Sequence, residues 1–177
     1  SFICDCGNGA SGPAPIAETQ EISGNHNFLF GEIDGSFPNH HPNPVDPETL
    51  AILRKAVADA GADLGIGFDG DGDRIGIVDA KGRQVPGDFL TAFLARDILA
   101  RHAGAPVILD VKSSDMAMAL IAEAGGDAQI WKTGHSHMKT RMAEINAPLA
   151  GEMSGHIFIT DGFYGFDDAL YVGLRVL

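Results

Sequence analysis

The residues with the clearest chemical potential form one short run, Asp69-Gly70-Asp71-Gly72-Asp73-Arg74. In an extended backbone, residues at i, i+2 and i+4 point to the same side, so the three aspartates are expected to converge. Two such anions about 4 Å apart repel by about 4 kcal/mol at an effective dielectric of about 20, so the group requires a cation. Oxygen-only ligands select a hard ion, Mg²⁺ or Ca²⁺. The run therefore predicts a metal site beside an arginine that can pair phosphate oxygens.

This acidic run has three competing interpretations. A solvated surface loop is the simplest, but apolar stretches on both sides place the aspartates at strand ends. An EF-hand requires glycine at the sixth loop position and glutamate at the twelfth, where this chain has Arg74 and Ala80. A haloacid-dehalogenase-type phosphatase also starts with Asp-x-Asp after a strand, but it places Thr or Val where this chain has Asp73. A metal site for phosphoryl chemistry fits the run best.

A second group of reactive side chains lies in the glycine-bounded turn Gly151–Gly155 and in His156, which follows it. Glu152 and Ser154 are two residues apart and can face one ligand together. A carboxylate beside a hydroxyl suits neighbouring sugar hydroxyls, which donate and accept hydrogen bonds at once. An ordinary turn, in which Ser154 bonds to the backbone, is the alternative. Spacing alone does not separate the two.

Basic side chains supply further candidates. The stretch Lys132–His137 leads toward Lys139 and Arg141, and this local basic cluster either receives an anionic substrate near a helix N-terminus or forms a solvated helix start. Lys112 directly follows an apolar stretch that is typical of a strand. Functional side chains often occupy such positions, although a single lysine is more often only part of the surface.

The elements that must position these residues alternate between strands and helices, which is typical of α/β folds. Strands are predicted at 64–68, 74–78, 107–111, 129–131, 148–150 and 156–159. Helices are predicted at 47–60, 89–102, between the 107–111 strand and Gly125-Gly126, at 138–145 and from about 167. We expect two consecutive, similar α/β domains, residues 1–84 and 85–177, each a mixed sheet with helices on its faces. The longest loop, 35–47, carries His40 and His41, which are interpreted as loop structure rather than metal ligands.

Composition narrows the class of protein. The chain has 177 residues, 45% of them hydrophobic, enough for one good-sized core or two small ones. Its net charge of -12 argues against nucleic acid as a partner. No apolar run approaches the roughly 20 residues of a membrane span, and no export signal opens the chain, so neither a membrane partner nor secretion is expected. Cys4 and Cys6 are interpreted as buried strand positions in a reducing cytoplasm.

Taken together, the motifs resemble the α-D-phosphohexomutase family, most closely its bacterial phosphomannomutase/phosphoglucomutase type. The segments that carry the resemblance follow the family's order over nearly the whole chain: Asp5–Gly9, Asp34–Pro42, Asp69–Arg74, Asp110–Lys112, Lys132–Ser136 and Gly151–His156. The acidic loop alone is moderately specific, whereas the ordered set is highly specific. Residues 10–30 match least.

The resemblance implies a four-domain enzyme of which this chain is a fragment covering domains two and three. Asp69, Asp71 and Asp73 would hold Mg²⁺ together with a phosphoserine oxygen. Arg74 would lie beside the phosphoryl group, and His156 would assist proton transfer, which makes these two the expected catalytic residues.

The same resemblance implies a phosphosugar as the substrate. Glu152 and Ser154 would bind the 3- and 4-hydroxyls of the sugar. Such contacts ignore the 2-position, which would allow both mannose and glucose. Lys112, Gly134 and His135 would line the substrate site.

The implied reaction interconverts hexose 6-phosphate and hexose 1-phosphate through an enzyme phosphoserine and a bisphosphate intermediate. The family's Thr-Ala-Ser-His-Asn-Pro loop is absent here, so domains one and four are expected as partners and the chain alone is expected to be inactive. Three alternatives stay open. They are a phosphoglucosamine mutase, which usually has Gln where Met153 stands, an aspartyl-phosphate phosphatase of the haloacid-dehalogenase type with Asp69 as nucleophile, and a non-catalytic sugar- or metal-binding module.

Overall fold

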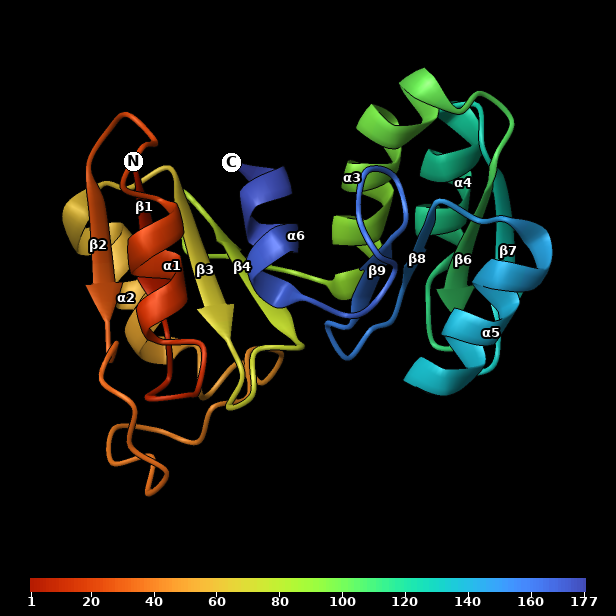
Figure 1. Cartoon of the computed structure of the whole chain (residues 1–177). Helices are drawn as coiled ribbons and strands as arrows, with labels where there is room; N and C mark the ends of the chain where they lie inside the picture. The colour runs from red at the N-terminus through yellow and green to blue at the C-terminus, as the bar shows by residue number, and fades with distance from the viewer. The chain divides into compact units, whose positions relative to one another are not determined.

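The computed structural model describes residues 1–177, which divide into two compact units. Unit 1 contains residues 1–85, 169–175 and 177, and unit 2 contains residues 86–168 and 176. Figure 1 shows that each unit is a sheet accompanied by helices. The boundary expected from the sequence assigns all of 85–177 to one domain, whereas the last helix, α6 (Ala169–Val176), packs in unit 1.

Unit 1 is built on a five-stranded mixed sheet in the order β2-β1-β3-β4-β5. Its strands are β1 (Phe2–Asp5), β2 (His26–Leu29), β3 (Leu64–Phe68), β4 (Ile75–Asp79) and β5 (Gln84–Val85). β1 runs parallel to β2 and β3, while β4 is antiparallel to both of its neighbours. The carboxyl ends of β1, β2 and β3 therefore share one edge, and the loops that follow these strands start side by side.

Helices cover both faces of this sheet. On one face, α2 (Ala51–Ala60) packs over a core of Ile3, Leu50, Leu53, Val57, Ala62 and Val78. On the other face, α1 (Pro13–Glu18) and α6 meet Cys4, Ile66 and Phe68 around a small apolar cavity. Ile3 and Cys4 thus point to opposite faces, as alternation along a strand requires. Both cysteines are buried and free, which confirms the prediction that they occupy buried positions.

The helix predicted from residue 47 begins four residues later, at Ala51. Asp46 nevertheless accepts a hydrogen bond from the amide of Glu48 at 2.9 Å, so it caps a turn instead of the helix itself. Gly61 ends the helix with φ +60°, as predicted. The elements β2, α1 and β5 were not predicted; the first two lie within the weakly patterned residues 10–30.

Unit 2 repeats the same strand order with a four-stranded sheet, β7-β6-β8-β9. Its strands are β6 (Pro106–Asp110), β7 (Asp127–Trp131), β8 (Leu149–Gly151) and β9 (Ile157–Ile159). β6 is parallel to β7 and β8, and β9 is antiparallel to β8, just as β1 is parallel to β2 and β3 and β4 is antiparallel to β3. The expectation of two similar α/β units with mixed sheets is confirmed.

The helices of unit 2 also lie on both faces of the sheet. α3 (Gly87–Arg101) and α4 (Asp115–Glu123) contact each other and pack on β8 and β7 respectively. α5 (His135–Ile145) covers the opposite face, where it forms a core of Ile108, Met138, Met142, Ala147, Ala150 and Phe158. The loops after β6, β7 and β8 consequently open at one edge of the sheet.

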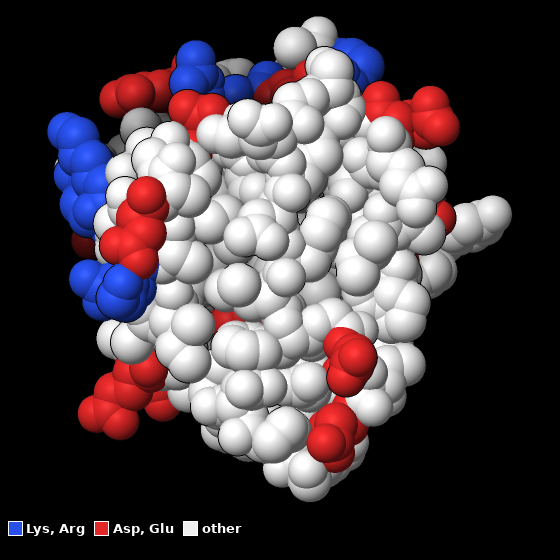
Figure 2. All heavy atoms as spheres, turned by 90° about the vertical axis from the view of Figure 1, so that its left-hand side faces the viewer, with Lys and Arg blue, Asp and Glu red and all other residues white.

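No helix of the chain combines the length and the apolar character needed to cross a bilayer. On the face drawn in Figure 2, charged side chains lie mainly toward the edges and uncharged side chains fill the centre. The net charge of -12 is therefore not concentrated in the middle of that face.

Candidate functional site

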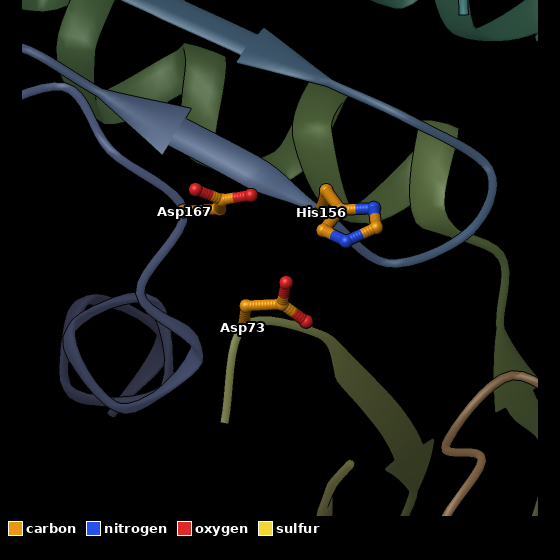
Figure 3. Close-up of side chains that lie close together, drawn as sticks. All are labelled: Asp73, His156 and Asp167. Atoms are coloured by element: carbon orange, nitrogen blue, oxygen red, sulfur yellow. The ribbon is translucent and has the colours of Figure 1, made fainter. Parts of the chain in front are cut away.

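The acidic loop joins β3 to β4 in unit 1 and brings its three aspartates together. One carboxylate oxygen from each of Asp69, Asp71 and Asp73 lies within 4.8 Å of the others. The aspartates converge for a different reason from the one expected, because the backbone of the loop is bent and not extended. Gly72 has φ +83°, a conformation that L-residues rarely adopt, and this turn folds the loop back on Asp69. Asp73 lies two residues before β4, close to its start (Figure 3).

Asp69 organises this loop from within. Its side chain is only 1% exposed, and Oδ1 accepts hydrogen bonds from the amides of Gly72, Asp73 and Arg74 at 3.0, 3.1 and 3.1 Å. Oδ2 accepts from Nε of Arg74 at 2.7 Å. Burial acts to raise the pKa of the Asp69 carboxyl, but the hydrogen bonds from the backbone and side chain of Arg74 outweigh it and lower the pKa. Asp69 is therefore an ionised carboxylate whose position is fixed by hydrogen bonds.

The donor set of the acidic loop fits a hard divalent cation. Asp71 is exposed and Asp73 half-buried, so both have oxygens that face solvent. Arg74 faces the cluster with its guanidinium, whose Nε lies 2.7 Å from Asp69 and 3.8 Å from Asp73. One guanidinium does not offset three carboxylates. All-oxygen ligands of this kind suit Mg²⁺ or Ca²⁺.

The turn between β8 and β9 in unit 2 joins three of the predicted site residues by hydrogen bonds. The hydroxyl of Ser154 donates to Oε2 of Glu152 at 3.0 Å and lies 3.0 Å from Nδ1 of His156. Nδ1 of His156 is also 3.2 Å from Oε2 of Glu152. His156 stands directly before β9, and Figure 3 shows it together with Asp167, which lies in the segment after that strand. The turn thus presents a carboxylate, a hydroxyl and an imidazole as one polar group.

Glu152 connects this turn to the loop before α5. Its carboxylate is 2% exposed, and Oε1 accepts from the amide of Gly134 at 2.7 Å. Burial acts to raise the pKa of Glu152, but hydrogen bonds from His156, Gly134 and Ser154 outweigh it and lower the pKa. His135 is exposed at the first position of α5, next to Gly134. Gly134 and His135 are thereby placed beside the turn.

Two residues of the predicted basic cluster have other partners. Nζ of Lys139 lies 2.7 Å from Oδ1 of Asp167, and the guanidinium of Arg141 stacks over the ring of Trp131 at 4.6 Å from its centroid. These contacts favour a structural role for both. Lys132 remains exposed on the loop that precedes α5.

A residue that sequence reasoning missed, Asp110, ties the loops of unit 2 together. It ends β6, is fully buried, and accepts from Ser113 at 3.0 Å, from Thr133 at 3.2 Å and from the amide of Met153 at 3.4 Å. Nζ of Lys112 lies 3.5 Å from its Oδ2, which places Lys112 at the same edge of the sheet as Glu152. Asp110 was part of the Asp110–Lys112 segment that carries the family resemblance, but its position at the end of an apolar strand gave no role for its side chain.

Comparison with known proteins gives the context for this geometry. The chain matches the family model of phosphoglucomutase/phosphomannomutase domain II over residues 1–82 and that of domain III over residues 86–177. It is 47% identical over 175 residues to the phosphomannomutase/phosphoglucomutase of Pseudomonas putida, covering 99% of this chain and 38% of that protein. The chain therefore spans well under half the length of this curated relative.

Solved structures agree. The crystal structure of a phosphoglucomutase/phosphomannomutase family protein from Burkholderia thailandensis superposes with a TM-score of 0.95 at 43% identity, over 99% of this chain and 38% of that one. An N-acetylphosphoglucosamine mutase from Aspergillus fumigatus, solved with GlcNAc-6P and magnesium, superposes with a TM-score of 0.67 over 98% of this chain and 40% of that one. At 18% identity this second likeness shows the fold alone. The chain belongs to the phosphoglucomutase/phosphomannomutase family.

Proposed function

We propose that this chain supplies the metal-binding and sugar-binding domains of a phosphohexomutase that interconverts hexose 6-phosphate and hexose 1-phosphate. The observation that carries the proposal is the convergence of Asp69, Asp71 and Asp73 beside Arg74. The relative from Pseudomonas putida bears the name phosphomannomutase/phosphoglucomutase, which supports mannose and glucose as the sugars. The whole reaction requires segments that this chain does not contain, because a serine nucleophile in the family's Thr-Ala-Ser-His-Asn-Pro context is absent.

In unit 1, the three aspartates would hold Mg²⁺, which when bound would neutralise charge on a phosphoryl group. Arg74 performs two tasks in this proposal. Its Nε fixes Asp69, and its terminal nitrogens form the planar fork that pairs phosphoryl oxygens. The oxygens of Asp69 already accept four hydrogen bonds, so Asp69 is suited to holding the shape of the loop. A buried carboxylate that is engaged in this way is poorly placed to attack phosphorus, which argues against the phosphatase alternative.

In unit 2, Glu152 and Ser154 would bind two neighbouring hydroxyls of the sugar. The hydrogen bonds to Gly134 and His156 keep Glu152 ionised and aligned, so it accepts from a sugar hydroxyl without prior rearrangement. Lys112 and Gly134 lie on loops at the same edge of the sheet, His135 begins α5 next to Gly134, and all three would line the substrate site.

His156 would move a proton to or from the reacting hydroxyl. Its Nδ1 faces Ser154 and Glu152, which both accept hydrogen bonds from an N–H. The imidazole ring of His156 is the group that would accept the hydroxyl proton. Glu152 would then stabilise the imidazolium.

Phosphate would come from a serine on another domain of the longer protein, and the sugar bisphosphate would return its second phosphate to that serine after turning in the site. Retention of the bisphosphate during this rotation requires a closed, charge-matched site. The missing domains one and four are thus proposed as partners of this chain.

Titration calorimetry tests the metal site directly. The 177-residue chain is expected to bind Mg²⁺, and Asp71→Asn is expected to weaken binding, because it removes one charged ligand while leaving the hydrogen bonds of Asp69 intact. Equal Mg²⁺ binding by both proteins would contradict the proposal.

Nuclear magnetic resonance tests the sugar site. Mannose 1-phosphate is expected to shift the amide signals of the turn 151–156, and Ser154→Ala is expected to weaken the effect. Ser23→Ala serves as the control, since Ser23 is exposed in unit 1 and its hydroxyl takes no part in the turn. Shifts elsewhere, with the turn unaffected, would exclude this assignment.

A further inference from the structure

The long loop of unit 1, residues 34–42, is fixed at its far end by a hydrogen bond between His40 and Asp5. Nε2 of His40 lies 2.9 Å from Oδ2 of Asp5, a carboxylate that is 2% exposed at the end of β1. The same carboxylate accepts the amide of Gly7 at 2.9 Å. The hydrogen bond with Asp5 outweighs burial and raises the pKa of His40. This pair attaches the 34–42 loop to the loop that follows β1.

Two further hydrogen bonds attach the same pair of loops. Nδ2 of Asn39 donates to Oδ1 of Asn8 at 2.7 Å, and the amide of Asp34 donates to the carbonyl of Asn8 at 3.0 Å. Asn8 is itself 6% exposed and has φ +55°, a conformation that asparagine tolerates better than most residues. The 34–42 loop is therefore anchored at both its beginning and its end.

Between these anchors, Phe37 reaches the acidic loop. A Cβ at Gly70 would lie 3.2 Å from Cζ of Phe37 and 3.4 Å from Cγ of Pro42, so both side chains pack on the backbone of Gly70. Phe37 adopts φ +50°, which is unusual for a bulky residue. Such strain persists only where the surroundings over-determine the conformation, and the anchors at His40 and Asn39 provide that constraint.

The opposite side of Gly70 is held by the loop after β1. The amide of Ala10 donates to the carbonyl of Gly70 at 2.8 Å, and a Cβ at Gly9 would lie 2.8 Å from the carbonyl oxygens of both Asp69 and Gly70. Gly70 thus lies between two packed segments. Because it separates Asp69 from Asp71, any shift of Gly70 changes how these carboxylates converge.

We propose that His40 and Phe37 are positioning residues for the metal site. The 34–42 loop is hydrogen-bonded to Asp5 through His40 and packs on Gly70 through Phe37, and it thereby holds the three aspartates in a cation-binding arrangement. The inference rests on the proposed function for its metal, but its geometric part concerns only the shape of the acidic loop. Phe37 packs on Gly70, and His40 holds the loop that carries Phe37, so neither residue is proposed as a ligand of the cation.

Amide hydrogen exchange tests the geometric part without metal. The amides of Gly72, Asp73 and Arg74 donate to Asp69 and report whether the loop keeps its shape. His40→Ala is expected to speed their exchange by about tenfold or more, since the local structure opens more often. His41→Ala is the matched control, because its side chain is exposed in the same loop. Unchanged exchange in His40→Ala would overturn the inference.

Electron paramagnetic resonance of Mn²⁺ tests the consequence for the metal. His40→Ala and Phe37→Ala are expected to weaken Mn²⁺ binding by about tenfold, the usual scale for groups that orient ligands. His40→Gln, which can still donate to Asp5, is expected to recover most of the loss. If His40→Ala unfolds unit 1, Phe37→Leu provides the milder change, with a smaller loss expected.

The outcomes separate the two proposals. If the wild-type chain binds no Mn²⁺ although His40→Ala speeds amide exchange in the acidic loop, the proposed metal function fails, whereas the positioning role of His40 is supported. If Asp71→Asn abolishes Mn²⁺ binding while His40→Ala and Phe37→Ala bind Mn²⁺ like wild type, the metal site is supported and the positioning role of His40 and Phe37 is refuted.

Discussion

The amide of Gly134 donates a 2.7 Å hydrogen bond to Oε1 of Glu152, eighteen residues away in the chain and across the edge of the sheet in unit 2. Gly134 has φ +124°, so the loop before α5 turns in a conformation that favours glycine. One glycine therefore supplies both the turn and the donor that orients the carboxylate of the proposed sugar site. The contact makes the loop before α5 and the turn after β8 a single unit.

Gly134→Ala is expected to lower the unfolding free energy by about 1–3 kcal/mol, because an L-residue at this φ is strained. It should also weaken the hydrogen bond to Glu152, which the amide chemical shift of residue 134 will report. Denaturant unfolding measures the first effect. Gly35→Ala is the control, since a Cβ there meets no atom within 4 Å. Equal losses in the two variants would contradict the argument.

The lowered pKa of Glu152 predicts a pH dependence of stability. In the unfolded chain this carboxyl takes up a proton near its usual value of 4.5, whereas in the folded chain it stays ionised to lower pH. Its stabilisation is therefore fully present above that value and is lost as pH falls toward the folded pKa. We expect the unfolding free energy of Glu152→Gln to fall less than that of wild type between about pH 6 and about pH 3.5. Parallel curves would exclude this contribution.

Substitutions of Asp69 and of Asp71 are expected to differ in their effect on the unfolding free energy but to agree in weakening metal binding. Asp69→Ala leaves three backbone amides and Arg74 without their acceptor, and breaking such a buried pair costs about 3 kcal/mol or more. Asp71→Ala removes an exposed side chain and one of three mutually repelling charges, so it should not destabilise the metal-free chain. Both variants should lose Mg²⁺ affinity. Calorimetry and denaturant unfolding, performed on the same samples, separate the two effects.

The strands that carry the site could be predicted because their signals are local. β3 lies at the predicted residues, and the glycine-spaced aspartates mark the loop after it. The convergence itself was predicted for the wrong backbone reason, since Gly72 bends the loop and Asp69 is enclosed by its own amides. Composition shows that a loop is acidic, but it does not show which groups of the loop are hydrogen-bonded to each other.

What the sequence did not predict depends on contacts between distant segments. β2 is an edge strand with only half-buried or exposed side chains, so it lacks the apolar pattern of a buried strand. α6 follows unit 2 in the chain but packs in unit 1, where Gly173 approaches Ile75 and Ile66. Asp110 resembles any aspartate after a strand until the donors from Thr133 and Met153 are seen. Such contacts between distant segments can be seen only in the folded structure.

The two cysteines are expected to be unreactive in the folded chain. Thiol reagents attack the thiolate, and burial is the main cause that raises the pKa of Cys6 to about 12. Burial also raises the pKa of Cys4, with a smaller effect of the neighbouring Cys6 and Asp5. A disulfide-exchange reagent at about pH 8 should therefore modify neither thiol within minutes, whereas both should react after denaturation. The denatured sample is the control for reagent and thiol content. Rapid modification of one thiol in the native chain would show that the face of the sheet beneath α1 and α6 opens, which the packing around Cys4 argues against.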